Sequence, residues 1–180
     1  MPAHIAMLRG INVSGHKIIK MEQLRASFEA LSFRSVKTYV QSGNVVFEAE
    51  NDSAATLAGR IEKKIRCDFG FSVVVLLKTS KDMEQIVRDN PLLREAGIDH
   101  SKLHVTFLSD AAPKTAEDRL KALAANPERF HVNGSEIYLY CPNGYGTTKL
   151  SNNAIEKKLG VGATTRNWKS VNALLAMARS

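Results

Sequence analysis

Apolar and polar residues alternate along residues 1–79 in a pattern that predicts six elements of secondary structure. The apolar run at 4–8 is typical of a buried strand, and Ser42-Gly43-Asn44 is typical of a hairpin turn. Four apolar residues recur at helical spacing between 20 and 32. The expected elements, in chain order, are a strand at 4–8, a helix over about 20–32, strands at 36–40 and 45–47, a helix around Leu57, Ile61 and Ile65, and a strand at 72–77.

The second half of the chain repeats much of this order. Thr79 and Asp82 have the spacing of a capping box, which predicts a helix near 80–88, and Asn133-Gly134 predicts a tight hairpin. The elements expected after that helix are a strand at 103–108, a helix over 114–125 with Thr115 and Asp118 at capping-box spacing, strands at 130–132 and 136–141, and helices over 151–159 and about 165–179.

The order of these elements predicts an α+β fold of two related subdomains. Residues 1–79 have the β-α-β-β-α-β order of a ferredoxin-like unit. Residues 80–101 are expected to connect the subdomains as a helix and a loop. Residues 102–180 then read as a related β-α-β-β-α unit with an extra C-terminal helix.

Ferredoxin-like topology brings three segments that are distant in sequence to one edge of the first sheet. The end of the first strand, the hairpin between the next two strands and the start of the fourth strand all meet there. The polar side chains expected at this edge are Arg9, Asn12, Lys17, Gln41, Ser42 and Asn44. An arginine fork suits a phosphate or a carboxylate, and amide or hydroxyl groups can complete the shell. The alternative is that the short polar side chains satisfy the backbone of turns.

Residues 10–15 have the G-x-x-x-x-G spacing of a phosphate-binding P-loop and lie between a predicted strand and a predicted helix. However, His16 precedes Lys17, and Ile18 stands where a P-loop has Ser or Thr to hold magnesium. The predicted sheet is also antiparallel. We therefore expect a simple anion site at the N-terminus of the first helix and not a nucleotide hydrolase.

The last predicted helix opens on Thr164-Thr165-Arg166-Asn167-Trp168. Thr165 is expected to be its N-cap, and Trp168 is expected to begin an apolar stripe that faces the core. A cation such as Arg166 in a first helical turn opposes the helix dipole. Thr165, Arg166 and Asn167 are therefore candidates for holding an anion, and an ion pair of Arg166 with a neighbouring acid is an equal alternative.

Charge is distributed unevenly along the chain. The 180 residues include 25 Lys and Arg against 18 Asp and Glu, a net charge of +7, and their 44% hydrophobic content is that of a folded domain. Residues 9–37 carry +4 and residues 146–180 carry +5, whereas residues 80–145 carry −2. If the two basic segments line one groove between the subdomains, its field would attract a polyanion. The alternative is that these cations belong to solvated helix faces.

Sequence motifs for catalysis, cofactors or metals are missing. There is no G-x-S-x-G elbow, H-E-x-x-H pair, C-x-x-C pair or EF-hand loop, so we expect neither a cofactor nor a bound metal. His100 and His104 fall in a loop and a strand and so lack the spacing of helical ligands. The two cysteines, a short N-terminal apolar run and the lack of a spanning segment predict a cytoplasmic protein that does not contact membranes.

Several strings, in this order, resemble one bacterial family. They are Leu8-Arg9-Gly10-Ile11-Asn12-Val13, Lys20-Met21 with Leu24-Arg25, Thr38-Tyr39-Val40-Gln41-Ser42-Gly43-Asn44-Val45-Val46-Phe47, Asn90-Pro91 and Thr164-Thr165-Arg166-Asn167-Trp168. Together they resemble the DUF1697 family, a domain of unknown function, over about residues 3–178. The resemblance implies a bacterial cytosolic protein with a two-subdomain α+β fold. It implies no activity, substrate, cofactor or catalytic residue.

These observations favour a protein that binds a phosphorylated or polyanionic ligand, a class that includes nucleic acid. The expected site is a basic groove between the subdomains, built from residues 9–17, 41–44 and 164–168. A small-molecule enzyme that uses the same groove, with His16 or Lys17 moving a proton, is the competing hypothesis. A third hypothesis is an interaction module in which these motifs are only turns and caps. The sequence assigns neither a reaction nor an oligomeric state.

Overall fold

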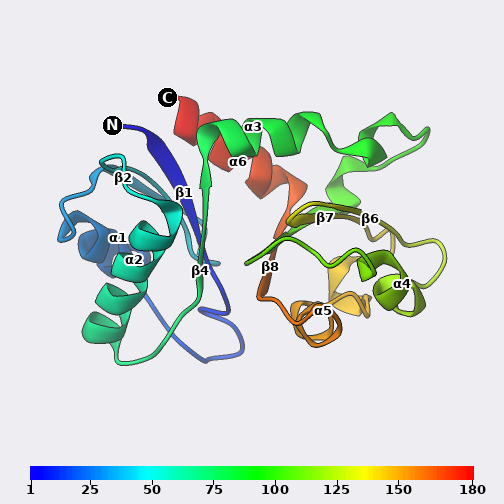
Figure 1. The fold of residues 1–180 in the computed structure, drawn as a ribbon, viewed down its shortest axis with the longest axis horizontal. Coiled ribbons are helices and arrows are strands. Elements are labelled where there is room, and N and C mark those ends of the chain that lie inside the picture. The colour runs from blue at the N-terminus through cyan, green and yellow to red at the C-terminus, as the bar shows by residue number, and fades with distance from the viewer. The chain divides into compact units, whose positions relative to one another are not determined.

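The computed structural model describes all residues 1–180 and divides them into two compact units. Unit 1 comprises residues 1–85 and 173–180, and unit 2 comprises residues 86–172. Each unit has its own four-stranded antiparallel sheet and its own helices, which confirms the predicted α+β class with two similar subdomains (Figure 1). The limits differ from the predicted domains of 1–79, 80–101 and 102–180, because both unit boundaries fall inside helices.

In unit 1 the first strand of the chain is central in the sheet. The strand order is β2-β3-β1-β4, and β1 pairs antiparallel with β3 on one side and β4 on the other. This is the β-α-β-β-α-β arrangement that the sequence pattern predicts. The elements are β1 (Ala3–Leu8), α1 (Met21–Glu29), β2 (Arg34–Tyr39), β3 (Asn44–Glu48), α2 (Ala54–Phe69) and β4 (Val75–Thr79), followed by α3 (Ser80–Arg88).

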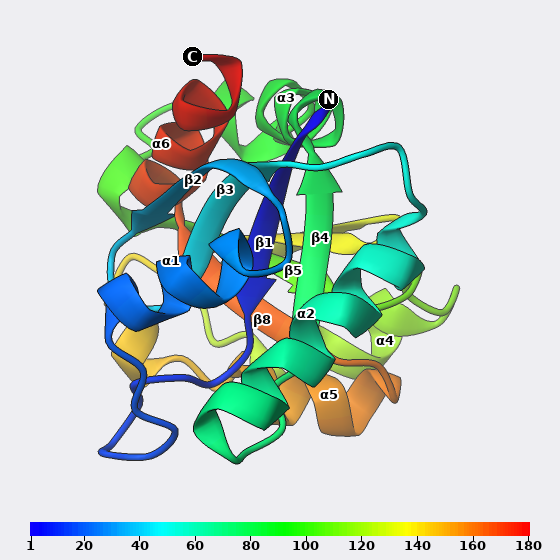
Figure 2. The ribbon, with the colours of Figure 1, turned by 90° about the vertical axis from the view of Figure 1, so that its left-hand side faces the viewer.

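The core on the helix side of unit 1 lies between the sheet and helices α1 and α2, which cover one face of the sheet in Figure 2. Ala6 and Leu8 of β1 are fully buried there. Phe47 packs against Phe28 and Phe33, with ring centroids 5.3 Å and 4.6 Å apart. Burying each such side chain contributes about 1.5–3 kcal/mol to the stability of the fold.

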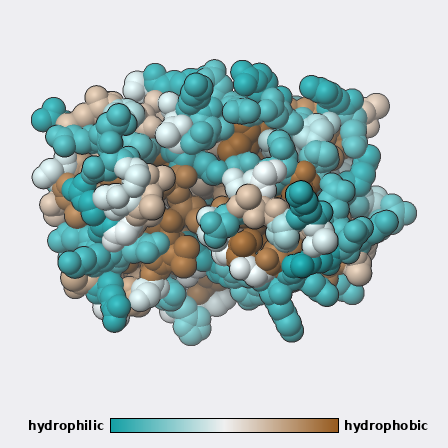
Figure 3. All heavy atoms as spheres, in the orientation of Figure 1, coloured by the Kyte–Doolittle hydropathy of each residue, from teal (hydrophilic) through white to brown (hydrophobic).

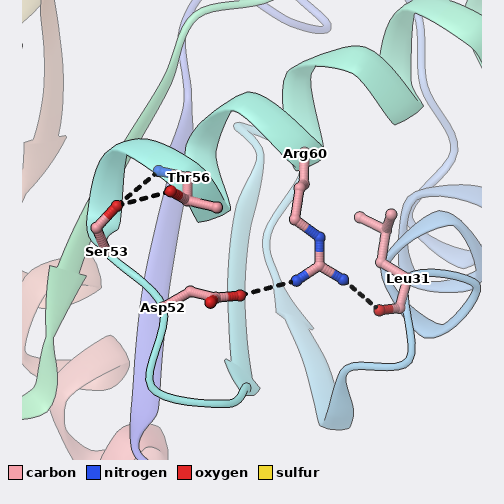
Figure 4. A network of polar contacts seen from close by, with 5 residues as sticks. All are labelled: Leu31, Asp52, Ser53, Thr56 and Arg60. Carbon is pink, nitrogen blue, oxygen red and sulfur yellow. Dashed lines mark hydrogen bonds and ion pairs between the residues drawn. The ribbon is translucent and has the colours of Figure 1, made fainter.

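The start of α2 is tied to the segments around it by a small polar network (Figure 4). The Ser53 hydroxyl caps the helix by accepting a hydrogen bond of 3.1 Å from the Thr56 N–H. One turn later, Arg60 donates to the Asp52 carboxylate at 3.2 Å and to the Leu31 carbonyl at 3.0 Å. The Arg60 guanidinium therefore joins α2 to the loop that precedes it and to the chain that follows α1.

Unit 2 has the same strand arrangement as unit 1. Its order is β6-β7-β5-β8, with β5 central and antiparallel to both β7 and β8. The elements are β5 (Leu103–Leu108), α4 (Ala116–Leu120), β6 (Arg129–Asn133), β7 (Glu136–Tyr140), α5 (Asn152–Leu159) and β8 (Ala163–Asn167), followed by α6 (Trp168–Arg179). Short 3₁₀ helices lie at η1 (Pro91–Arg94), η2 (His100–Lys102), η3 (Lys121–Leu123) and η4 (Tyr145–Thr147).

The fourth strand of unit 2 was not predicted from the sequence. Residues 163–167 pair with residues 104–108 of β5, and α6 begins only at Trp168. The prediction of a helix from 165 with Thr165 as its N-cap is therefore wrong. The β-branched side chains of Thr164 and Thr165 favour extended backbone. Gly160, with a φ of 71°, ends α5 early enough to leave room for this strand. Unit 2 is thus a second complete β-α-β-β-α-β unit.

Two predicted helix caps have different outcomes. At α3 the capping box is confirmed, because the Thr79 N–H donates to Asp82 at 3.0 Å and the Asp82 N–H donates to the Thr79 hydroxyl at 3.1 Å. At α4 the predicted capping box is wrong, because Thr115, at a ψ of 7°, makes no side-chain cap bond.

The predicted apolar stripe of α6 is confirmed, since Trp168, Val171, Leu175 and Ala178 are all buried. No helix is both long and apolar enough to cross a membrane.

Candidate functional site

Three segments of unit 1 meet where β1 ends and β4 begins, as the predicted topology requires. The Leu8 N–H donates to the Gly43 carbonyl and the Arg9 N–H donates to the Val74 carbonyl, both at 2.9 Å. The loop after β1, drawn in blue, leaves the sheet at the lower side of Figure 2. We call this region, residues 9–20, 40–44 and 69–74, the strand-end edge.

Asn12 ties the loop after β1 to the hairpin between β2 and β3. Its amide nitrogen donates to the Ile19 carbonyl at 3.0 Å and to the Gln41 carbonyl at 2.8 Å. Its amide oxygen accepts from the Ile19 N–H at 2.8 Å. The backbone of Asn12 has a φ of 54°, a conformation that asparagine tolerates better than most residues. The side-chain amide of Asn12 is therefore fully hydrogen-bonded to backbone groups of the protein.

Lys17 ties the same loop to the chain that leads into β4. Its ammonium group donates to the Ser72 carbonyl at 2.8 Å. Between Asn12 and Lys17 the loop forms a small hairpin, in which the His16 N–H donates to the Val13 carbonyl at 2.9 Å. The N–H groups of Ser14 and Gly15, at the tip, form no hydrogen bond with the protein. The loop is thus anchored at both sides and open at its tip.

The turn at residues 41–44 is built from its own polar side chains. Asn44 is fully buried, and its amide nitrogen donates to the Tyr39 carbonyl and to the Ser42 hydroxyl, both at 2.9 Å. Gly43 has a φ of 87°, and a Cβ there would lie 2.7 Å from the Ile11 side chain. Gln41 contributes its carbonyl to the Asn12 contact, while its side chain is exposed. Among the predicted site residues of this turn, Asn44 has a clear structural role.

The charged groups of the strand-end edge all have the same sign. Arg9 is partly exposed, and His16, Lys17 and Lys20 are exposed. The three segments contain no Asp or Glu. The Glu62 carboxylate of α2 also lies at the start of β4, where it accepts a hydrogen bond of 3.0 Å from the Val75 N–H. The loop of residues 9–20 itself carries three cations and no carboxylate, so the loop attracts anions.

The strand-end edge also exposes aliphatic side chains that the sequence reasoning missed. Val13, Ile18, Val40 and Val74 are 58%, 59%, 49% and 47% exposed. Brown, hydrophobic atoms interrupt the teal surface on the face that Figure 3 draws. The sequence contains one indication of this surface. Val13 and Ile18 are apolar residues in a polar, glycine-containing loop, and they fit neither the helical nor the strand pattern of buried positions.

The remaining predicted residues, Thr165, Arg166 and Asn167, lie in unit 2 on β8. The Thr165 hydroxyl donates to the Asn152 side chain at 2.7 Å. The Asn167 side chain accepts from the Ser170 N–H at 2.8 Å, so Asn167 takes the capping position at α6 that was predicted for Thr165.

Arg166 is a buried strand residue and does not lie in a first helical turn. Its guanidinium donates to the Thr164 hydroxyl at 2.7 Å and to the Thr165 carbonyl at 3.0 Å. Only 6% of the residue is exposed, and this burial lowers the pKa of Arg166 to about 10, with Tyr145 acting in the opposite direction. Arg166 remains positively charged at neutral pH.

Other chemistry-bearing groups do not gather into a cluster. No three His, Cys, Asp or Glu side chains of residues 1–180 lie close enough to hold a metal ion. His104, on β5, stacks on Tyr145 with ring centroids 4.9 Å apart, and burial lowers the pKa of His104. Burial raises the pKa of the Cys141 thiol to about 11, whereas Cys67 is exposed.

A hollow away from the predicted residues also lies in each unit. In unit 1 a pocket of about 360 Å³ lies at Ser27, Asp68 and Phe69 between α1 and α2. The Ser27 hydroxyl donates to the Asp68 carboxylate at 2.6 Å, and this bond lowers the pKa of Asp68. In unit 2 a pocket of about 410 Å³ is lined by residues that include Glu95, Lys121 and Arg129, where Glu95 and Arg129 form an ion pair.

Comparisons with known proteins agree with the fold. The model of the family described as "Protein of unknown function (DUF1697)" matches residues 1–138. The chain is similar to a solved structure described as that of the conserved bacterial protein SP0830 from Streptococcus pneumoniae, with a TM-score of 0.76 and 20% sequence identity over 98% of each chain. At that identity the likeness is one of fold. No curated protein matches the chain.

Proposed function

The chain belongs to the DUF1697 family, whose description assigns no function. We propose that the protein binds an anionic ligand at the strand-end edge of unit 1. The ligand class is a phosphorylated or polyanionic molecule. The observation that carries this proposal is the anchored loop of residues 9–20, which has cations and no carboxylate.

The anchoring matters because it fixes the positions of the charges before a ligand arrives. Asn12 and Lys17 hold the loop against its two neighbours, so binding does not have to order the loop backbone. Arg9 follows the central strand directly, and its backbone is bonded to Val74. A guanidinium and two ammonium groups on a preordered loop suit an extended anion with several charges.

The backbone of the loop supports the same function. The tip N–H groups of Ser14 and Gly15 donate to no backbone acceptor, and the two residues have positive φ angles of 52° and 74°. Successive N–H groups in such turns form concave sites for anions. We restrict the proposal to unit 1, since Thr165 and Asn167 bond to neighbours inside unit 2.

A salt titration tests the proposal. Fluorescence anisotropy of labelled single-stranded oligothymidylate and of labelled polyphosphate is measured with the purified protein, starting at low salt. For the oligonucleotide, we expect log K to fall linearly with log salt, with a slope of about −0.7 for each phosphate contact. Lys17→Gln and Lys20→Gln should each reduce the size of that slope by about 0.7.

Arg34→Gln is the matched control. Arg34 is exposed, belongs to the same unit and begins β2, so it lies at the opposite end of the strand that runs to the strand-end edge. The substitution changes the net charge by the same amount as Lys17→Gln. Equal effects of the two substitutions, or no binding of either probe at about 50 mM salt, would reject the proposed site.

A further inference from the structure

Exposed aliphatic side chains are concentrated at one place in this molecule. Five large apolar residues are about half exposed, and four of them, Val13, Ile18, Val40 and Val74, lie at the strand-end edge. Single exposed apolar residues are normal on a protein surface, but four of five at the same end of one sheet mark that end as a candidate interaction surface.

Backbone contacts bring these four side chains into one region of unit 1. Val74 follows Ser72, which Lys17 contacts, and Val74 itself bonds to Arg9. Val40 precedes Gln41, which Asn12 contacts from the middle of the loop. Val13 and Ile18 lie within that same loop. The four residues therefore span the width of the sheet, from the end of β2 to the start of β4.

The surface is prepared for binding without large conformational change. Val and Ile are branched at Cβ and lose little side-chain freedom when they become buried. Their loop is already held by Asn12 and Lys17. Polar side chains with long flexible stems would have to be ordered at a greater entropic cost.

We propose that the strand-end edge docks a polypeptide segment that carries both aliphatic and acidic side chains. The acidic part rests on the proposed function, since the same cations would hold carboxylates. The aliphatic part rests on Val13, Ile18, Val40 and Val74. An extended peptide can place an apolar side chain on each exposed valine and a carboxylate beside Lys17 or Lys20, because its side chains alternate along the backbone.

The type of the exposed side chains favours a peptide over two other anionic partners. Single-stranded nucleic acid is held by aromatic side chains on which bases stack. The half-exposed apolar side chains here are aliphatic, whereas Phe69 and Phe71 pack against the core and are only partly exposed. Membrane-surface segments present Trp, Phe and Leu toward the lipid. Three valines and one isoleucine, together with the cations of a loop that itself carries no carboxylate, complement an acidic and aliphatic peptide best.

Two synthetic peptides of equal length and equal glutamate content test this inference. One carries leucine between the glutamates, and the other carries serine. We expect the leucine peptide to bind at least about tenfold more tightly, since burial of about 60 Å² of apolar surface is enough for that gain. The double substitution Val13→Ser, Ile18→Ser should remove the difference in affinity between the two peptides. Lys17→Gln should lower the affinity for both peptides by the same factor.

Ile98→Ser, at a partly exposed position in unit 2, is the control and should leave the leucine advantage intact. Thermal unfolding of each variant checks that the fold persists. Equal affinity for the two peptides overturns the inference. Tighter binding of oligothymidylate or of phosphatidylserine vesicles than of the leucine peptide also overturns it, while leaving the proposed anion binding in place. Failure of every anionic probe rejects the proposed function itself.

Discussion

The side chain of Asn12 donates a hydrogen bond of 2.8 Å to the backbone carbonyl of Gln41, 29 residues further along the chain. The same amide nitrogen also donates to Ile19. Two separate loops at the strand-end edge are therefore joined by one side chain, and this contact determines how firmly the proposed binding surface is held.

Asn12→Asp should weaken this joint strongly. Aspartate keeps the acceptor for Ile19 but loses both donors, and its carboxylate then faces the carbonyls of Ile19 and Gln41. We expect the free energy of unfolding to fall by about 2–3 kcal/mol, measured by urea denaturation at pH 7. Asn143→Asp, at an exposed turn position, should change it by less than about 0.5 kcal/mol. Equal small losses for both variants would mean that the Asn12 contacts contribute little.

Gly43→Ala should destabilise unit 1 more than Gly10→Ala. Both glycines have positive φ angles, 87° and 72°, so each alanine is strained by about 1–2 kcal/mol. Only at Gly43 does a Cβ also collide with neighbours, 2.7 Å from Ile11 and 2.9 Å from Leu8. That overlap adds about 1–3 kcal/mol. The difference between the two variants in free energy of unfolding, measured by urea denaturation, reports the steric overlap alone. Equal losses for the two variants would contradict the close packing of Gly43.

Thr79→Ala and Thr115→Ala test the two helix caps. The Thr79 hydroxyl accepts a bond from the Asp82 N–H, so its removal should cost about 1 kcal/mol of unfolding free energy. Thr115 makes no side-chain cap bond, so Thr115→Ala should cost less than about 0.5 kcal/mol. Thermal denaturation of the two variants provides the comparison. A larger loss for Thr115→Ala would contradict the cap geometry.

The two cysteines should react with a thiol reagent at very different rates. Cys141 is fully buried and its pKa is raised to about 11, so only about 0.1% of it is thiolate at pH 8. Cys67 is exposed. We expect Ellman's reagent to detect one fast thiol in the native protein and a second after denaturation. Cys67→Ser should abolish the fast phase, and two fast thiols in the native state would contradict the burial of Cys141.

Stability should decrease as the pH falls from about 7.5 to 5.5. Burial lowers the pKa of His4 and of His104 below their usual value near 6.5, against the attraction of Asp82 for His4 and a backbone bond for His104. The unfolded chain then binds more protons than the folded chain in this range, which favours unfolding. Denaturant midpoints at the two pH values measure the effect.

The double substitution His4→Gln, His104→Gln should flatten the pH dependence, whatever its effect on absolute stability. Asp68 and Asp99 do not interfere, because their pKa values are lowered and they lose their contribution only as the pH falls below the usual carboxylate range. A denaturant midpoint that rises as the pH falls to 5.5 would contradict the conclusion that the two histidines cause the pH dependence of stability.

The strand-end edge could be predicted from the sequence because element order alone determines which strand ends meet. The role of Asn12 could not, since an amide that holds a ligand and an amide that holds backbone offer the same donors and acceptors. Its partner on Gln41 becomes visible only when the two loops are placed in space. Sequence patterns therefore located this region without separating its structural side chains from its exposed ones.

The strand β8 escaped prediction for a different reason. Thr164 to Asn167 immediately precede the apolar stripe of α6, and threonine followed by a helical pattern is typical of an N-cap. Pairing with β5, which is nearly 60 residues earlier, decides their conformation instead. Arg166 consequently became a buried strand residue, and the interpretation based on the helix dipole does not apply to it.

The division of the chain has a consequence for the order in which the protein assembles during synthesis. Unit 1 needs residues 173–180 as well as residues 1–85, and all of unit 2 lies between them in the sequence. A ribosome therefore releases every residue of unit 2 before it supplies the last segment of unit 1. Domains generally fold as they emerge, so the second unit can finish folding while the first still lacks its final helical turns.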